Sequence, residues 1–462
     1  MKKLLSTAGA ILLLCAAMPA RAEDAAGDWA GVLGGQLHLI VHIQKAPDGK
    51  LSGIVESVDQ GDAKIPIDAI DATPDRLKFT VAAIAGAYDA RWDDAGKRWA
   101  GTWTQGGGSA PLNLSRATAA DAPKPPERPQ EEAIAASPLP YRDEMATIAN
   151  GAQATLAGTL TRPDGKGPFP AVVLVSGSGP NTRDEAVFNH KIFLVLADYL
   201  ARNGIAVLRY DKRGIGQSTG DYGKATTAEF TSDAQAAAAW LRAQPGIDAR
   251  HVGLVGHSEG GLIVPAVAVA DPKTAFIVLM AGPGLPGDKL LLRQQALIAK
   301  ASGVPDATVT QNLAITERVY DAVKAAKTEA DAIAAARAVL DPEVAKGTLT
   351  RDRADASIKQ VTSAWMRAFL ASDPVPVLQK VRVPVLALGG SLDLQVPAAE
   401  DLAAIKTALK ADRDVTVTEL PGLNHLFQDA KTGSPAEYAT IEQTVSPAAL
   451  KIVGDWIKAR AR

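Results

Sequence analysis

The stretch HVGLVGHSEGGLIVPAVA (residues 251–268) decides how this chain folds. It begins with an apolar run of strand length, turns at Gly256-His257-Ser258-Glu259-Gly260, and continues as an apolar run of helical length. A Gly-x-Ser-x-Gly turn between a strand and a helix lifts the serine hydroxyl above a sheet, because small residues let strand and helix approach closely. The pattern therefore predicts Ser258 as a nucleophile on an α/β scaffold.

A second match, Gly216-Gln217-Ser218-Thr219-Gly220, lies in a different context. Turn residues precede it at 211–214 and follow it at 220–223, so no strand leads into it and no helix leaves it. Ser218 is therefore interpreted as a structural loop residue. The neighbouring Arg209, Asp211 and Arg213 are interpreted as a structural ion cluster near the edge of the sheet.

From residue 138 onward, short apolar runs alternate with amphipathic segments of helical length. Nearly continuous apolar strands are typical of a parallel sheet covered on both faces, and the alternation predicts right-handed crossovers. Residues 285–378 interrupt this alternation of strands and helices, because they contain several helical runs and no strand-like run. An insertion of this kind predicts a helical cap over the site. Strands are predicted at 170–177, 204–211, 251–258, 275–282, 383–390 and 415–422, and helices at 193–204, 231–246 and 309–327.

A serine hydroxyl needs a general base, and the chain contains six histidines. His425 alone follows Ser258, in the loop after the last predicted strand, and enzymes with this turn run in the order serine, acid, histidine. Asp393 follows the strand at 383–390 and is predicted to orient the imidazole of His425 and to stabilise its charged form. The alternative for His425 is a histidine on a surface loop.

Two backbone N–H groups are needed to stabilise the charge that develops on the carbonyl oxygen. One is expected from Glu259, at the start of the helix, and the other from Ser178, with Gly179 as the neighbouring alternative. The competing interpretation of Ser176-Gly177-Ser178-Gly179-Pro180 is a plain Gly-rich turn. The Glu259 carboxylate either selects positively charged or polar substrates or packs against an arginine.

The candidates for substrate contacts are Gly179, Trp365 and Phe369. Trp365 and Phe369 lie one helical turn apart, so both face the same side of their helix. They either line an acyl pocket or pack between the cap and the core, and packing is the preferred interpretation.

The first 137 residues differ from the rest of the chain in composition and in the pattern of their apolar residues. Lys2 and Lys3, a short apolar run and Ala20-Arg21-Ala22 predict a signal peptide (residues 1–22) that is cleaved after Ala22, and therefore a periplasmic or secreted protein. Cleavage would remove Cys15, the only cysteine, and leave no disulfide. An uncleaved membrane anchor is the alternative.

Residues 23–116 contain short alternating strands separated by turn residues, which predicts a small antiparallel barrel or sandwich. Residues 117–137 are rich in Pro, Ala and charge and predict a linker, extended where the prolines cluster, before a second domain at 138–462. The strands are predicted at 37–43, 50–58, 76–84, 87–93 and 98–105, and Trp29, Trp92, Trp99 and Trp103 are interpreted as core.

The composition excludes several classes of function. The 49 basic and 51 acidic residues balance to a formal charge of −2, which argues against a nucleic-acid partner. No stretch after the signal peptide is long and apolar enough to predict stable membrane insertion. Metal-binding and phosphate-binding motifs are missing, so neither a metal nor another cofactor is implied, and the oligomeric state stays open.

Four segments resemble a known family: VLVSGSGPNTRDE, VLRYDKRGIGQSTG, VGLVGHSEGG and LGGSLDLQVP. They are similar to bacterial exported α/β-hydrolases that act as serine esterases, related to the dienelactone-hydrolase and prolyl-oligopeptidase branches, over about residues 140–460. The resemblance implies the α/β-hydrolase fold, the triad Ser258, Asp393 and His425, and an oxyanion hole from Ser178 and Glu259. One departure is Ser176-Gly177, where many lipases carry His-Gly-Gly, and it argues against lipase-like handling of bulky or long-chain esters.

The predicted function is hydrolysis of small or short-acyl carboxylic esters through an acyl-enzyme, with a small-molecule ester as the partner. A serine peptidase of prolyl-oligopeptidase type is an alternative, but such relatives usually carry a large propeller, for which residues 23–116 are too few. Thioester hydrolysis or acyl transfer to another acceptor needs the same triad. A non-catalytic binding protein on the same scaffold is the least favoured alternative.

Overall fold

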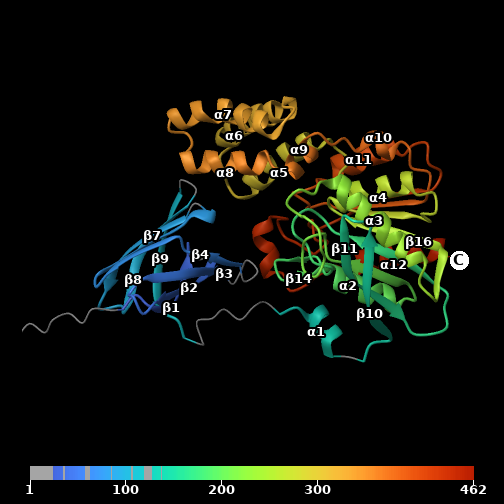
Figure 1. Cartoon of the computed structure of the whole chain (residues 1–462), viewed down its shortest axis with the longest axis horizontal. Coiled ribbons are helices and arrows are strands. Elements are labelled where there is room, and N and C mark those ends of the chain that lie inside the picture. The colour runs from blue at the N-terminus through green and yellow to red at the C-terminus, as the bar shows by residue number, and fades with distance from the viewer. Residues whose placement is uncertain are drawn as a thin grey trace, which may run out of the picture. The chain divides into compact units, whose positions relative to one another are not determined.

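The computed structural model describes residues 24–34, 37–57, 63–84, 86–105, 108–118, 127–136 and 138–461. The predicted signal peptide, with Cys15, lies outside the described residues. The chain divides into two compact units, of which the first ends at Pro123 and the second contains Lys124–Arg462 (Figure 1). Each unit has its own hydrophobic core.

The first unit is an antiparallel sheet, as the sequence predicts. Within its described residues the strand order is β4-β3-β2-β1-β9-β8-β7-β6-β5, and the sheet curls so that β3 and β5 are in contact. Three of the predicted tryptophans, Trp29, Trp99 and Trp103, are buried and Trp92 is partly buried against them. Trp29 and Trp99 pack edge to face, and Arg116 stacks over the Trp29 ring. The strands are β1 (Gly27–Leu33), β2 (Leu37–Lys45), β3 (Leu51–Ser57), β4 (Ala63–Pro66), β5 (Ala69–Thr73), β6 (Arg76–Val81), β7 (Gly86–Asp93), β8 (Arg98–Gln105) and β9 (Gly108–Arg116).

The end of the predicted linker is not extended. Residues Pro129–Ala136 form helix α1, which begins with a proline and two glutamates, residues that favour the first turn of a helix. The Arg128 guanidinium donates to the Ala439 carbonyl, and the Gln130 side chain donates to the Val445 carbonyl, both in the second unit. These long-range hydrogen bonds, which composition does not reveal, make α1 part of the second unit.

The second unit is built on an eight-stranded sheet, in the order β10-β11-β15-β12-β16-β17-β18-β19. The last six strands in this order run parallel, and all six were predicted from their apolar runs. The antiparallel hairpin β10–β11 was not predicted. The strands are β10 (Tyr141–Asn150), β11 (Ala154–Pro163), β12 (Phe169–Val175), β15 (Ala206–Tyr210), β16 (Ile247–His257), β17 (Ile277–Met280), β18 (Val385–Gly390) and β19 (Val415–Leu420).

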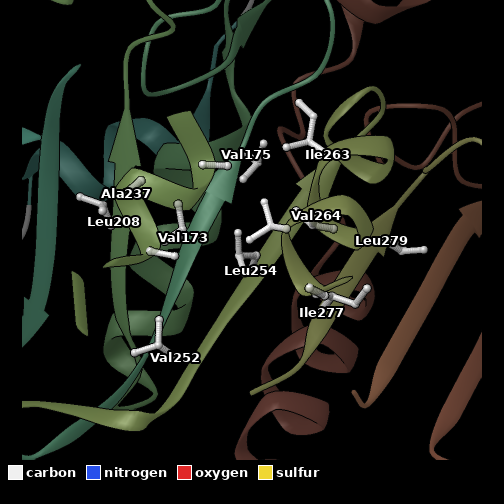
Figure 2. Packing of buried hydrophobic residues seen from close by; sticks show 14 of the residues in the cluster. Val173, Val175, Leu208, Ala237, Val252, Leu254, Ile263, Val264, Ile277 and Leu279 are labelled. Atoms are coloured by element: carbon white, nitrogen blue, oxygen red, sulfur yellow. The ribbon is translucent and has the colours of Figure 1, made fainter. Parts of the chain in front are cut away.

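Helices cover both faces of this sheet. Helices α2 (Ile192–Arg202) and α12 (Pro447–Arg460) pack on one face, and α3 (Thr227–Arg242), α4 (Gly260–Ala270) and α11 (Ala398–Ala408) pack on the other. Alternate residues of each parallel strand serve the two layers, as a strand's period of two requires. Figure 2 shows side chains of the second layer, among them Leu254 of β16 and Val264 of α4.

The segment between β17 and β18 is helical (Figure 1), which confirms the predicted cap insertion. It has its own core, which includes Val323, Leu340 and Leu370. None of the helices in the described part of the chain is both long and apolar enough to cross a membrane. The cap helices are α5 (Gly287–Ala301), α6 (Asp306–Ala325), α7 (Glu329–Ala345), α8 (Arg351–Val361), α9 (Ala364–Leu370) and α10 (Val375–Leu378).

Candidate active site

Ser258 lies at a tight turn between β16 and α4. Its φ is +53°, a conformation that costs a non-glycine residue energy and that persists only where the surroundings impose it. The Ser258 N–H donates to the Met280 carbonyl at 2.9 Å, and its own carbonyl accepts from the Gly261 N–H at 2.8 Å. A Cβ on Gly260 would collide with the Val175 carbonyl oxygen, so the close approach of strand and helix requires glycine there. The predicted elbow is present.

His425 and Asp393 form a buried hydrogen-bonded pair. Nδ1 of His425 lies 2.8 Å from Oδ2 of Asp393, and only about 4% of His425 is exposed. The other carboxylate oxygen, Oδ1, accepts the backbone N–H groups of Gln395 and Val396, both at 2.8 Å. Because the carboxylate can only accept, Nδ1 carries the proton and Nε2 keeps the lone pair that a general base needs.

The loop that carries His425 contacts the elbow through His257, the residue before Ser258. Nε2 of His257 donates to the His425 carbonyl at 3.0 Å, and the centroids of the two imidazole rings lie 5.0 Å apart. Ser258, Asp393 and His425 thus lie in the loops that follow the carboxyl ends of β16, β18 and β19, and the loop of His425 contacts the residue before Ser258.

The loop after β12 packs against the elbow. A Cβ added to Gly177 would lie 2.9 Å from the Cβ of Ser258. The Gly177 N–H donates to Glu185 at 2.5 Å, so this amide is occupied. By contrast, within the described residues the N–H groups of Ser178 and Glu259 donate to no protein group. Two unpaired N–H groups next to Ser258 are what an oxyanion hole requires.

The Glu259 carboxylate is fully engaged inside the protein. One oxygen accepts from the Trp365 indole N–H at 2.7 Å and from the Thr227 hydroxyl at 2.8 Å, and the other accepts from Lys212 at 3.3 Å. Of the two interpretations of the Glu259 carboxylate, the structure shows packing against a basic side chain, with a lysine in place of the expected arginine. Both carboxylate oxygens are occupied and the residue is buried, which disfavours contact with a positively charged or polar substrate.

Trp365 and Phe369 stack on each other, with ring centroids 5.1 Å apart. Phe369 is buried in a small apolar cluster with Leu290 of the cap and Val396, which lies three residues after Asp393. Half-buried Leu262, from the first turn of α4, packs against the same cluster. The aromatic pair thus packs between the cap and the site, which is the preferred interpretation of the two.

The remaining sequence candidates have structural roles. The Ser218 hydroxyl donates to the Asp211 carbonyl at 2.7 Å and accepts from the Ala157 N–H at 2.9 Å. Arg209, Asp211 and Arg213 all form ion pairs, with Asp184, Arg183 and Asp233 respectively. Burial lowers the pKa of His190 to about 4, so this histidine is neutral in its core position.

Sequence reasoning missed three residues around the site: Glu185, His257 and Lys212. Glu185 and His257 form a buried ion pair, with Oε1 3.0 Å from Nδ1. Burial lowers the pKa of His257, but the Glu185 carboxylate and its hydrogen bond raise it more, so its pKa lies above the ordinary value. Lys212 donates to the Gly177 carbonyl at 2.6 Å. No local pattern connects these residues, because the strand order brings them together.

Within the described residues, no group of three or more His, Cys, Asp or Glu side chains is arranged to hold a metal ion.

The fold and this arrangement define the class of protein, which is a serine hydrolase of the α/β-hydrolase fold. Residues 151–416 match the family described as X-Pro dipeptidyl-peptidase (S15 family). The match spans more than half of the chain, and the chain belongs to this family. The matched range includes Ser258 and Asp393 and ends before His425.

Two curated relatives are similar to parts of this chain. Esterase EstD of Thermotoga maritima is 28% identical over 284 residues, which is 61% of this chain and 61% of that protein. Polyketide transferase grgF of Penicillium sp. is 30% identical over 152 residues, 32% of this chain and 47% of that protein. The chain thus spans less than two thirds of the length of either relative.

Solved structures show lower identities. The α/β hydrolase GrgF from Penicillium sp. sh18 superposes with a TM-score of 0.44 at 19% identity, covering 70% of this chain and 99% of that one. The Pyrococcus furiosus esterase Pf2001 has a TM-score of 0.44 at 14% identity, covering 70% of this chain and 92% of that one.

Proposed function

We propose that the protein hydrolyses small carboxylic esters with short acyl chains through an acyl-enzyme on Ser258. The observation that carries this proposal is the contact between the elbow and the His425–Asp393 pair, where His257 donates to the His425 carbonyl. The similarity to esterase EstD supports an ester rather than another acyl substrate.

In the proposed mechanism, the Ser258 hydroxyl attacks the ester carbonyl while Nε2 of His425 takes its proton. Asp393 holds the imidazole in the required tautomer and stabilises the imidazolium. The free N–H groups of Ser178 and Glu259 donate to the oxyanion. The imidazolium then protonates the leaving alcohol, and a water molecule activated by His425 releases the acid from the acyl-enzyme.

The packing of the cap favours a substrate with a short acyl chain. The side chain of Phe369, which belongs to α9, packs against α5 and the loop after Asp393, and the residue is only about 5% exposed. The half-buried leucines beside it, Leu262 and Leu285, offer an apolar wall of limited extent.

The test is hydrolysis of p-nitrophenyl esters from acetate to palmitate by residues 23–462. Activity on the short esters that disappears in Ser258→Ala is the expected result. Ser178→Ala is the matched control, because it keeps the backbone N–H and is expected to retain activity. Equal activity in wild type and Ser258→Ala, or no activity on any ester, would overturn the proposal.

A dipeptidyl peptidase is the second candidate, and the description of the matching family favours it. Such an enzyme must hold the charged amino terminus of its substrate, which calls for a free carboxylate near the nucleophile. The carboxylate nearest in sequence to Ser258 belongs to Glu259 and is occupied by Trp365, Thr227 and Lys212. Release of p-nitroaniline from Gly-Pro p-nitroanilide, with no turnover of esters, would favour the peptidase.

Acyl transfer is tested in the same assay, because an added alcohol would then divert the acyl group from water to a new ester. The name of the relative grgF is the reason to include this arm. We also propose that the protein is exported after cleavage behind Ala22. The intact mass of the protein from the extracytoplasmic fraction should match a chain that begins at Glu23.

A further inference from the structure

The pair Glu185–His257 lies beside the nucleophile but has no part in the mechanism described above. Both residues are buried, with about 1% and 2% of their surfaces exposed. Burying two charges costs free energy unless each is well compensated, so a buried ion pair next to an active site needs a reason.

The hydrogen bonds of His257 define its charge state. Nδ1 contacts Oε1 of Glu185 at 3.0 Å, and Nε2 contacts the carbonyl oxygen of His425 at 3.0 Å. A carboxylate and a carbonyl can only accept, whereas a neutral imidazole has one donor. Both contacts are therefore satisfied only when His257 is an imidazolium.

The same carboxylate oxygen of Glu185 also accepts the Gly177 N–H at 2.5 Å. Gly177 precedes Ser178, which the proposed function assigns as an oxyanion donor, and it packs against the Cβ of Ser258. A continuous chain of hydrogen bonds thus runs from Gly177 through Glu185 and His257 to His425. It connects the loops after β12, β16 and β19, which are the three loops that carry the oxyanion donor, the nucleophile and the base.

The backbone at Glu185 is strained in a way that favours a functional role. Its φ is +46°, in the left-handed region that glutamate rarely adopts, and Oε2 has no hydrogen-bond partner within the described residues. An apolar pair of the same size would avoid both the burial of charge and the unpaired Oε2 atom. What the pair supplies is a fixed spacing between the oxyanion loop and the base loop.

We propose that the Glu185–His257 ion pair is a positioning element that holds the oxyanion loop and the His425 loop in register for attack by Ser258. The inference rests on the proposed function for its kinetic consequence, but the hydrogen-bonded chain itself does not. Loss of the pair should reduce kcat and leave KM nearly unchanged, because the affected groups act on the transition state rather than on the bound ester.

The kinetic test compares Glu185→Gln and Glu185→Ala with wild type on p-nitrophenyl acetate. We expect kcat to fall by roughly 10- to 100-fold in Glu185→Ala, the scale of a small misplacement of catalytic groups. Glu185→Gln keeps an acceptor for the Gly177 N–H and should recover part of this loss. The matched control is Asp233→Asn, which removes a charge from the buried pair with Arg213, whose other hydrogen bonds within the described residues go to Asn150 and the Glu229 carbonyl. An unchanged kcat in Glu185→Ala, or an equal fall in Asp233→Asn, would overturn the proposal.

A second measurement does not depend on ester turnover. In the Ser258→Ala background, side-chain ¹⁵N resonances should report His257 as an imidazolium at neutral pH, and Glu185→Gln should shift the resonances of His425. A neutral His257, or His425 resonances that do not respond, would refute the positioning role even in an active esterase. If the coupling is present and wild type cleaves no ester, it is the proposed function that fails.

Discussion

The two Gly-x-Ser-x-Gly segments of this chain share a sequence pattern and differ in everything that makes a serine reactive. Ser258 follows a buried parallel strand, is held at φ +53° and lies beside two N–H groups that have no partner among the described residues. Ser218 lies in a loop, and its hydroxyl donates to the Asp211 carbonyl and accepts from the Ala157 N–H. The difference teaches that the motif is only as informative as the elements on either side of it.

The contrast predicts selective covalent labelling, with the largest effect of all the tests. A fluorophosphonate needs a serine that is accessible and activated by a base. Ser258 follows His257, which donates to the His425 carbonyl, whereas Ser218 bonds to Asp211 and Ala157. We therefore expect peptide mass spectrometry to find the whole label on Ser258 and none on Ser218. Label on Ser218, or on neither serine, would contradict the assignment.

The acid of the proposed triad sharpens the comparison, because the proposal gives an oriented base to Ser258 and none to Ser218. In Asp393→Asn, the carbonyl oxygen remains with the N–H groups of Gln395 and Val396, so the amide NH₂ faces Nδ1 of His425. A donor at that position forces the proton of the imidazole onto Nε2, which removes the base. We expect kcat to fall by about 10⁴-fold at neutral pH.

The control for this substitution is Asp429→Asn, four residues after His425. Asp429 is exposed and accepts from the Gln443 amide, outside the triad. Its loss should leave kcat near the wild-type value, and a comparable fall would mean that the acid has been misassigned.

Local pattern explains why much of this site could be predicted from sequence. The elbow, the six parallel strands and the order of Ser258, Asp393 and His425 are read from apolar runs and short motifs. The hairpin β10–β11 was missed because its polar alternation resembles no buried parallel strand, and α1 was missed because composition hides the anchoring of Arg128 and Gln130. Glu185 and His257 were missed for a different reason, since only the strand order makes them neighbours.

Two buried aspartates, like the two serines, differ in the groups that surround them. Asp393 and Asp401 each accept two backbone N–H groups on one oxygen, but Oδ2 of Asp393 faces His425 while Oδ2 of Asp401 has no partner in the described chain. Burial raises the pKa of Asp401 to about 6. The folded state thus keeps a proton that the unfolded state loses near pH 4, so stability falls as the pH rises from about 4 to 6.

This fall should be absent when residue 401 cannot titrate. Relative to Asp401→Asn, the wild-type free energy of unfolding is expected to decrease by about 2 kcal/mol between pH 4 and pH 7. Urea unfolding of both proteins at the two pH values measures the difference. A wild-type curve parallel to that of Asp401→Asn would show that the carboxyl titrates at its ordinary pKa.

The smallest effect concerns Ser218 itself. Ser218→Ala leaves the half-buried Ala157 N–H without the side-chain acceptor that joins the loop to β11, and an unsatisfied donor away from water costs about 1–3 kcal/mol. The free energy of unfolding should fall by that amount while kcat stays unchanged, because the loop lies outside the triad. Gly220 offers a check on the same loop: its φ is +107°, so Gly220→Ala should also destabilise without inactivating. A loss of kcat in Ser218→Ala at full stability would mean that the second motif takes part in the chemistry. The flanking strand and helix would then not be what distinguishes Ser258 from Ser218.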